Sequence, residues 1–243
     1  MNESPRKQFS GLVPRGRPKV TAEQALINAL RFIGGTPSGD AFKRLSELSP
    51  SAVPSSPDEQ CADYFHKIVS PGVYYSIVDW KDGKTRFPGG IVESASLLDR
   101  AAASEIPSFV RGGFVRPNAV SGEGSGWNGC HCDIDVVRHD YLLAESDTLP
   151  LPVQAALLHR MIDVGMPIAS AVFTGGKSIH ALIRINASSG EEFRSESRRI
   201  FSRLTHLGFD PSTGNASRMA RIPGCIRTLP DGREARQQLL YLA

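Results

Sequence analysis

The chain has 243 residues, of which 40% are hydrophobic and 22% are charged, and its formal net charge is +3. This is the composition of an ordinary globular protein that is long enough to bury a substantial core. No apolar run reaches the roughly 18 residues of a membrane span, and the N-terminus has no secretory signal. We therefore expect a cytoplasmic protein with reduced cysteines and no membrane partner.

The first part of the chain predicts a tail followed by a small α/β unit. Residues 1–19 are predominantly basic and contain Pro and Gly, which is typical of a flexible tail. Capping residues and apolar spacing then predict helices over 21–33, 56–69 and 92–104, and an apolar run predicts a strand over 73–80. We expect residues 20–107 to form an N-terminal α/β unit.

The pattern is stronger after residue 108. An extended segment and a glycine-rich loop lead to residue 129. Strands are then predicted over 130–137, 168–174, 179–185, 217–222 and 237–242, and helices over 150–165 and 191–208. This β-α-β-β-α-β order predicts an α+β, RRM-like (ferredoxin-like) module over 108–243, with two helices on one face of an antiparallel sheet and the other face open for chemistry. The N-terminal unit would pack against it to give one composite domain.

The stretch Ala171–Ser178, AVFTGGKS, satisfies a relaxed phosphate-loop pattern. A phosphate loop needs a helix to begin at its Lys-Ser, because the helix N-terminus supplies the amides that hold the phosphates. The residues that follow alternate instead, with apolar side chains at 179, 181, 183 and 185. The sequence therefore predicts a β-hairpin with TGGK as its turn and excludes an ATPase loop. Ser178 and His180 then project from the face opposite the apolar side chains.

Asp133 and Asp135 lie two residues apart in the strand predicted over 130–137. Such side chains project from the same face, about 6–7 Å apart, where two carboxylates repel each other unless a cation bridges them. Mg²⁺ and Mn²⁺ are held by one or two carboxylates together with substrate phosphates, so the pair indicates a two-metal site. On its own the pair fits an exposed strand edge equally well, but the flanking Ile134 and Val136 favour a central strand.

Asp210 is a third candidate acid. It follows the helix predicted over 191–208 and precedes a segment that contains Arg218 and Arg221. The aspartate alone fits an ordinary Asp-Pro turn. The arginines fit either surface positions or the recognition of a triphosphate or a template backbone.

Together these motifs resemble those of the archaeo-eukaryotic primase superfamily, the primase-polymerases of archaea, eukaryotes, plasmids and phages. They are the acidic pair Asp133-Ile-Asp135, the Ser178-Ile-His180 pattern after TGGK, and Asp210 followed by SRMARIPG. The resemblance covers about residues 108–228 in order and spacing. It implies the catalytic domain of a primase-polymerase of plasmid, phage or mobile-element type.

The resemblance also implies a role for each matching residue. Asp133, Asp135 and Asp210 would bind two Mg²⁺ or Mn²⁺ ions, and Asp210 would help to activate the primer 3′-hydroxyl. The phosphates of the incoming nucleotide would be bound by Lys177, Ser178, His180, Arg218 and Arg221. The chemistry would be an in-line displacement, in which the metals stabilise the attacking and leaving oxygens.

The implied function is template-directed transfer of nucleotides from NTPs or dNTPs to a primer 3′-hydroxyl or an initiating nucleotide during DNA replication. Single-stranded DNA template and primer are the expected partners, with a helicase or another replication protein. The sheet face and arginine surfaces would hold the template through phosphate contacts and base stacking. Two alternatives stay open: a non-catalytic replication initiator or single-stranded-DNA-binding module with the same fold, and a metal-dependent nuclease that uses the same carboxylates.

Overall fold

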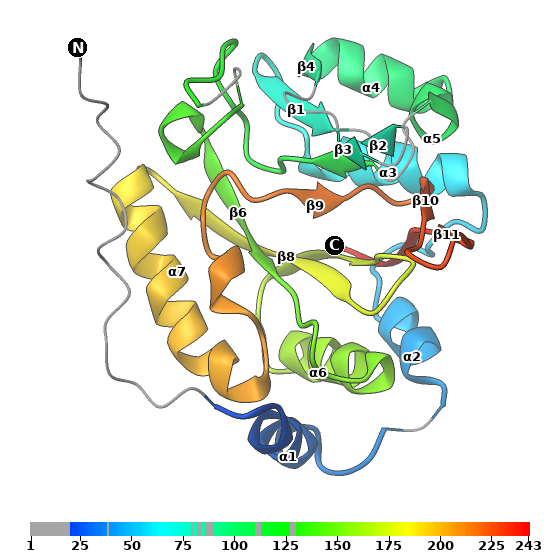
Figure 1. Cartoon of the computed structure of the whole chain (residues 1–243), viewed down its shortest axis with the longest axis vertical. Coiled ribbons are helices and arrows are strands. Elements are labelled where there is room, and N and C mark those ends of the chain that lie inside the picture. Colours follow the sequence, from blue (N-terminus) through cyan, green and yellow to red (C-terminus); the bar gives the residue numbers. More distant parts are fainter. Residues whose placement is uncertain are drawn as a thin grey trace.

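The computed structural model describes residues 20–37, 39–78, 80–81, 84–85, 90–109, 113–126 and 130–243. The tail predicted over 1–19 lies outside them. Within these residues the protein is of the mixed α+β class, and its strands pair in antiparallel sheets (Figure 1).

Two four-stranded sheets form the framework. The first sheet has the order β4-β1-β5-β9, with strands Gly90–Glu93, Tyr74–Val78, Phe114–Val115 and Ala220–Arg221. The second sheet has the order β12-β7-β8-β6, with strands Gln238–Leu242, Ile168–Phe173, Ile179–Ala187 and His139–Ala144. Two short hairpins complete the strands: β2-β3, from Trp80–Lys81 and Lys84–Thr85, and β10-β11, from Ile226–Thr228 and Glu234–Arg236.

The helices are α1 Ala22–Ile33, α2 Ala41–Glu47, α3 Pro57–Ile68, α4 Ser94–Ala102, α5 Glu105–Phe109, α6 Leu151–Asp163 and α7 Gly190–Leu204. Local signals explain where the best-defined ones begin and end. The Thr21 side chain accepts a hydrogen bond from Gln24 N at the start of α1, and Gly34 ends this helix in the left-handed conformation. Ser189 caps α7 in the same way through Glu192 N. In the described part of the chain, no helix is both long and apolar enough to cross a bilayer.

Both faces of the second sheet are buried. One face packs with α6 and α7 through alternate side chains, Leu142, Ala144, Ile179, Ala181 and Ile183. The other face packs with α3 and the first sheet through the intervening side chains, Tyr141, Leu143, Val172, Leu182 and Leu239. The prediction of an open sheet face was therefore wrong, because both sets of alternate residues are apolar and each set has a covering layer.

Five predicted helices, those over 21–33, 56–69, 92–104, 150–165 and 191–208, correspond to α1, α3, α4, α6 and α7. Four predicted strands, those over 73–80, 168–174, 179–185 and 237–242, correspond to β1, β7, β8 and β12. The segment 217–222 differs from the prediction. It contributes only Ala220–Arg221, as β9, and this strand pairs with β5 in the first sheet. The final strand β12 pairs with β7. The RRM-like arrangement is thus not confirmed, and the first sheet joins strands from both sides of the predicted boundary at residue 107.

Candidate active site

The TGGK segment is the turn of the β7-β8 hairpin. Thr174 N donates to Ser178 O over 3.0 Å, and β8 begins at Ile179, where a phosphate loop would require a helix. Gly175 has a φ of +74°, and a Cβ there would lie 3.2 Å from Ala235 Cβ and from Arg236 O. The turn needs glycine both for its conformation and for its contact with the β10-β11 hairpin. The prediction of a hairpin is confirmed.

The register of β6 and β8 brings Glu145 and His180 together. Ala144, the last residue of β6, lies opposite Ala181, so Glu145 follows the strand beside His180. His180 Nε2 donates to Glu145 Oε2 over 2.7 Å, and His180 Nδ1 accepts from Arg221 N over 3.2 Å. These two contacts define the Nε2–H tautomer, since Nδ1 is the acceptor. His180 is 7% exposed, so its orientation is fixed by β6 on one side and β9 on the other.

Glu145 is a buried carboxylate that stays ionised. Its side chain is 13% exposed, and Oε1 accepts from Arg218 Nη2 over 3.3 Å. Burial alone would raise the pKa of Glu145. The hydrogen bonds from His180 and Arg218, together with the positive charge of Arg218, outweigh this effect and lower the pKa to about 2. At neutral pH the site therefore contains a desolvated negative charge.

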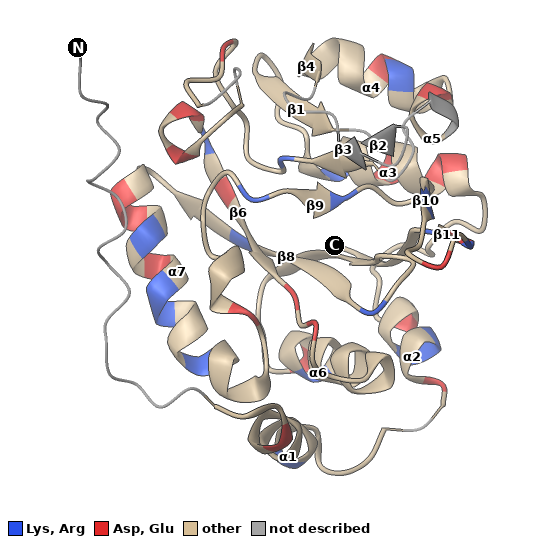
Figure 2. Ribbon diagram, in the orientation of Figure 1, with Lys and Arg blue, Asp and Glu red and all other residues tan. Residues whose placement is uncertain are grey.

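Two further arginines lie beside this carboxylate. The Arg221 guanidinium carbon lies 3.6 Å from the centre of the Phe114 ring. Burial, followed by repulsion from Arg227, lowers the pKa of Arg221 to about 9, and attraction to Glu145 opposes this shift. Arg227 Nη1 donates to Thr174 O over 3.4 Å at the TGGK turn. Figure 2 shows blue segments on β9 and at the turn before β8, with red segments where the chain leaves β6. This mixed cluster can bind phosphate oxygens and, through its acids, a cation.

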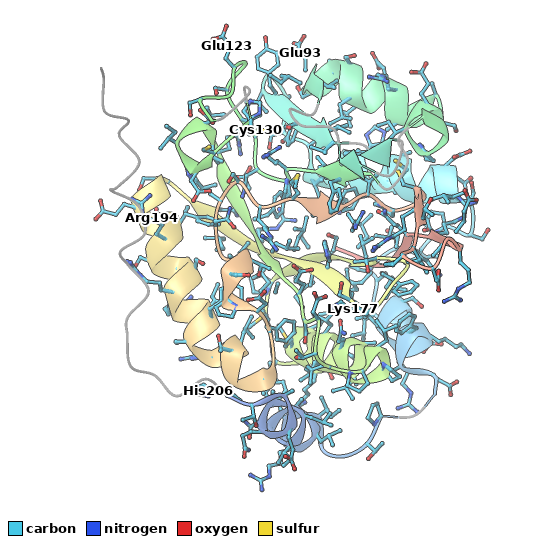
Figure 3. The ribbon with its side chains drawn as sticks, viewed as in Figure 1. Glu93, Glu123, Cys130, Lys177, Arg194 and His206 are labelled. Atoms are coloured by element: carbon cyan, nitrogen blue, oxygen red, sulfur yellow. The ribbon has the colours of Figure 1, made fainter. Side chains whose placement is uncertain are left out.

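Lys177 and Ser178 lie in the same turn but in different environments. Lys177 Nζ forms an ion pair with Asp147 Oδ2 over 3.1 Å, and both side chains are exposed. Ser178 is buried, and its Oγ lies 3.4 Å from Thr174 Oγ1. Figure 3 labels Lys177 at the hairpin turn, well separated in this view from Cys130 in the segment before β6. The structure thus places Lys177 on the accessible rim of the site and Ser178 inside it.

The segment 130–137 is not a strand. Asp133–Asp135 forms a 3₁₀ turn, and the flanking apolar residues are exposed, Ile134 at 83% and Val137 at 54%. Asp135 is buried, and its carboxylate accepts from Cys132 N over 2.6 Å and from Ser125 N over 3.1 Å. Burial raises the pKa of Asp135, but these hydrogen bonds give a net lowering. The prediction that the two aspartates share one face of a strand was wrong, because the turn directs the Asp135 carboxylate to backbone amides.

The other two predicted metal ligands also have partners. Asp133 is exposed, and its Oδ1 accepts from Ser217 N over 2.8 Å. Asp210 precedes the 3₁₀ turn Pro211–Thr213, and its carboxylate accepts from Ser212 N and Ser212 Oγ over 2.8 and 2.6 Å. Its backbone lies next to Glu145, since Asp210 N donates to Glu145 O over 2.9 Å. Of the three aspartates, Asp210 is thus the one held beside the Glu145 site.

The described residues contain no group of three or more His, Cys, Asp or Glu side chains that could hold a metal ion. The set Asp133, Asp135 and Asp210 is therefore not assembled into a metal site that the protein supplies alone. Glu145 and Asp147 provide a different donor set. Mg²⁺ is commonly held by one or two carboxylates plus the phosphates of a nucleotide. Glu145 contacts Arg218 and Asp147 contacts Lys177, so carboxylates and phosphate-binding side chains lie together and fit that chemistry.

The sequence analysis missed Glu145 and Asp147. Both follow the apolar run Tyr141-Leu-Leu-Ala144, which is β6. An acidic pair at the end of an apolar strand, one helix before the TGGK hairpin, is a signal that could have found them. Asp133-x-Asp135 has the same spacing and lies only slightly earlier in the chain, so spacing alone does not separate the two pairs.

The segment RIPG, residues 221–224, ends in a glycine whose conformation determines the path of the chain after Arg221. Gly224 has a φ of +86°, and a Cβ there would lie 2.3 Å from Pro57 O at the start of α3. The chain must therefore carry glycine here to pass from β9, which contains Arg221, to β10, which contains Arg227.

No protein-family model and no curated protein matches the sequence. Among solved structures, the primase RepB′ is similar at a TM-score of 0.49 and 16% identity, over 75% of this chain and 55% of that one. The AEP domain of the cyanophage S-2L primase-polymerase is similar at a TM-score of 0.41 and 15% identity, over 90% of each chain. The polymerase domain of Mycobacterium tuberculosis ligase D, in complex with DNA, has a TM-score of 0.42 and 13% identity, over 91% of this chain and 86% of that one. The chain thus spans about half the length of the RepB′ primase, and each match has low identity and a TM-score below 0.5.

Proposed function

We propose that this chain is a primase-polymerase domain that transfers nucleotides from NTPs or dNTPs to a primer 3′-hydroxyl or an initiating nucleotide on a DNA template. The observation that carries the proposal is the ionised Glu145, held by His180 and Arg218 between the two sheets and flanked by Arg221 and Arg227. A desolvated carboxylate among phosphate-binding guanidiniums suits a metal-bound nucleoside triphosphate. The resemblance of the Ser178-x-His180 hairpin to a primase motif supports the same function.

In the proposed reaction, the 3′-oxygen attacks the α-phosphorus of the triphosphate. A P–O bond forms to the primer, the bond to the β-phosphate oxygen breaks, pyrophosphate leaves, and the hydroxyl proton passes to solvent. Glu145 and Asp147 would hold the divalent cation, Mg²⁺ or Mn²⁺. When bound, this ion would stabilise charge on the attacking and leaving oxygens.

The remaining residues bind and orient the nucleotide. Arg221 and Arg227 would donate hydrogen bonds to the β- and γ-phosphates. The two guanidinium groups repel each other, and a polyanion bound between them would relieve this repulsion. His180 keeps Glu145 oriented through Nε2–H. Arg218, whose side chain is 41% exposed, links the site to solvent and to the incoming triphosphate. Lys177 would add charge at the rim. The metal-binding role of Asp133, Asp135 and Asp210 stays a prediction.

The test is a template-directed extension assay. The protein is incubated with single-stranded DNA, Mg²⁺ or Mn²⁺ and labelled NTPs or dNTPs, with and without a primer, and product lengths are read on a gel. We expect metal-dependent product growth. Binding of the template with no growth would instead indicate a replication initiator, and shortening of labelled DNA would indicate a nuclease.

A further inference from the structure

Phe114 lies directly opposite Arg221 in the pairing of β5 with β9. The Arg221 guanidinium carbon lies 3.6 Å from the centre of the Phe114 ring, which is close stacking. The next residue, Val115, is fully buried in the core between the sheets, whereas Phe114 is half-buried and belongs to neither hydrophobic core. The Phe114 ring therefore offers a half-buried aromatic face on which the arginine stacks.

The main chain and the side chain of Arg221 make contacts with different residues. Its backbone N–H donates to His180 Nδ1, which ties β9 to the site. Its side chain is half-buried and is repelled by Arg227, so the charge at this position has a desolvation cost. An aromatic face offsets part of that cost, since the negative face of the ring attracts the cation.

We propose that Phe114 is a positioning residue for phosphate binding: its ring holds the Arg221 guanidinium flat beside His180 and Arg227, in the orientation that receives the triphosphate. This inference rests on the proposed function of the site. Phe114 itself contacts no phosphate and acts through Arg221. Without the stacked ring, the Arg221 side chain would have to be ordered at each binding event, and this loss of conformational entropy would weaken the binding of phosphate.

The experiment measures nucleotide binding and turnover of Phe114→Leu, Phe114→Tyr, Arg221→Gln and the double variant Phe114→Leu/Arg221→Gln. Loss of the ring should raise the KM and the Kd for the nucleoside triphosphate about tenfold, with kcat within about twofold of the wild-type value. Phe114→Tyr, which keeps an aromatic face, should bind within about threefold of wild type. In the Arg221→Gln background, Phe114→Leu should cause no further loss, because the contact that it removes is already absent.

Phe42→Leu is the matched control for stability. Phe42 is a half-buried aromatic residue on α2 that packs against Phe173. Phe42→Leu should lower the thermal midpoint without changing nucleotide affinity. An equal loss of affinity in Phe42→Leu, an additive effect in the double variant, or a Phe114→Tyr variant as weak as Phe114→Leu would each overturn the proposal.

Inorganic tripolyphosphate separates this inference from the proposed function. Its Kd should show the same dependence on Phe114 and Arg221 as that of the nucleotide. If tripolyphosphate binds with this dependence but no primer is extended, the positioning role holds and the polymerase proposal fails. If the wild-type protein extends primers and Phe114→Leu binds both ligands normally, the positioning role fails alone. If the wild-type protein binds neither ligand, both fail.

Discussion

Two acidic pairs with the same spacing lie at the two ends of β6, and they have opposite environments. Before the strand, Asp133-x-Asp135 forms a 3₁₀ turn in which Asp135 is bonded to the amides of Ser125 and Cys132. After the strand, Glu145 in Glu145-x-Asp147 is bonded to His180 and is surrounded by guanidinium groups. The first pair completes the backbone hydrogen bonding of a loop, and the second contacts basic side chains.

Whether an acidic pair can bind a metal ion therefore depends on which groups already donate hydrogen bonds to its carboxylate oxygens. A carboxylate whose acceptors are filled by backbone N–H groups stabilises local structure, and a metal would have to break those bonds. A carboxylate held by a partly exposed arginine such as Arg218 can exchange that contact for a metal ion, since the guanidinium can turn to a phosphate. We therefore expect the two pairs to respond differently to substitution.

The largest expected effect is that of Glu145→Gln. The amide keeps the size of the side chain but removes the negative charge, so primer extension should fall by roughly 10³-fold, as a loss of about 4 kcal/mol of transition-state stabilisation would give. The initial rate of extension measures this, with thermal unfolding as a check on folding. Glu191→Gln, on the exposed surface of α7, is the matched control and should keep the wild-type rate.

Acid should destabilise the protein through the same carboxylate. The folded-state pKa of Glu145 is lowered to about 2, below its usual value, so its contribution to stability is complete above about pH 5 and is lost as the pH falls towards 2. This contribution is about 3 kcal/mol. In urea unfolding, the free-energy difference between wild type and Glu145→Gln should shrink by this amount between pH 6 and pH 2. Parallel pH profiles would contradict the assignment of the shift to Glu145.

Asp135→Asn should affect stability rather than catalysis. The amide group must direct an NH₂ towards one of the two backbone N–H groups that the carboxylate accepts from, which costs about 2 kcal/mol. Urea unfolding should show this loss. The extension rate per folded molecule should stay within about threefold of wild type, and a loss of rate with no loss of stability would show that Asp135 acts in the reaction.

The smallest effect is expected for Lys177→Ala. The Lys177 side chain is 70% exposed and pairs with an exposed carboxylate, a contact that contributes less than about 1 kcal/mol. The Kd for the nucleotide should rise by no more than about threefold. A loss of a hundredfold would mean that Lys177 holds phosphates as the lysine of a phosphate loop does.

The sequence predicted best the elements whose local signals agree with their packing. Helix α1 has an N-cap at Thr21 and a left-handed Gly34, and β8 alternates because His180 and its neighbours face different layers. These elements were found close to their true limits. The hairpin turn was also predictable, because an alternating strand directly after Ser178 leaves no room for a helix.

The segment around Asp133 could not be predicted in the same way. Ile134 and Val137 are residue types that are common in strands, yet both are exposed. The segment is instead held as a turn by hydrogen bonds from Ser217 N to Asp133 and from Ser125 N to Asp135. Such contacts join residues far apart in the chain and leave no periodic pattern. The contact of Phe114 with Arg221 depends in the same way on the pairing of two strands of two residues each, which have no signal of their own.

The most direct test of the account is primer extension by Asp133→Asn and Glu145→Gln, measured side by side under the same metal and nucleotide conditions. Asp133 is exposed, and its main contact is one backbone amide, so the substitution should leave the protein folded. The account predicts that Asp133→Asn keeps at least about a third of the wild-type rate while Glu145→Gln keeps less than about 1%. Loss of extension in Asp133→Asn, with activity retained in Glu145→Gln, would contradict it.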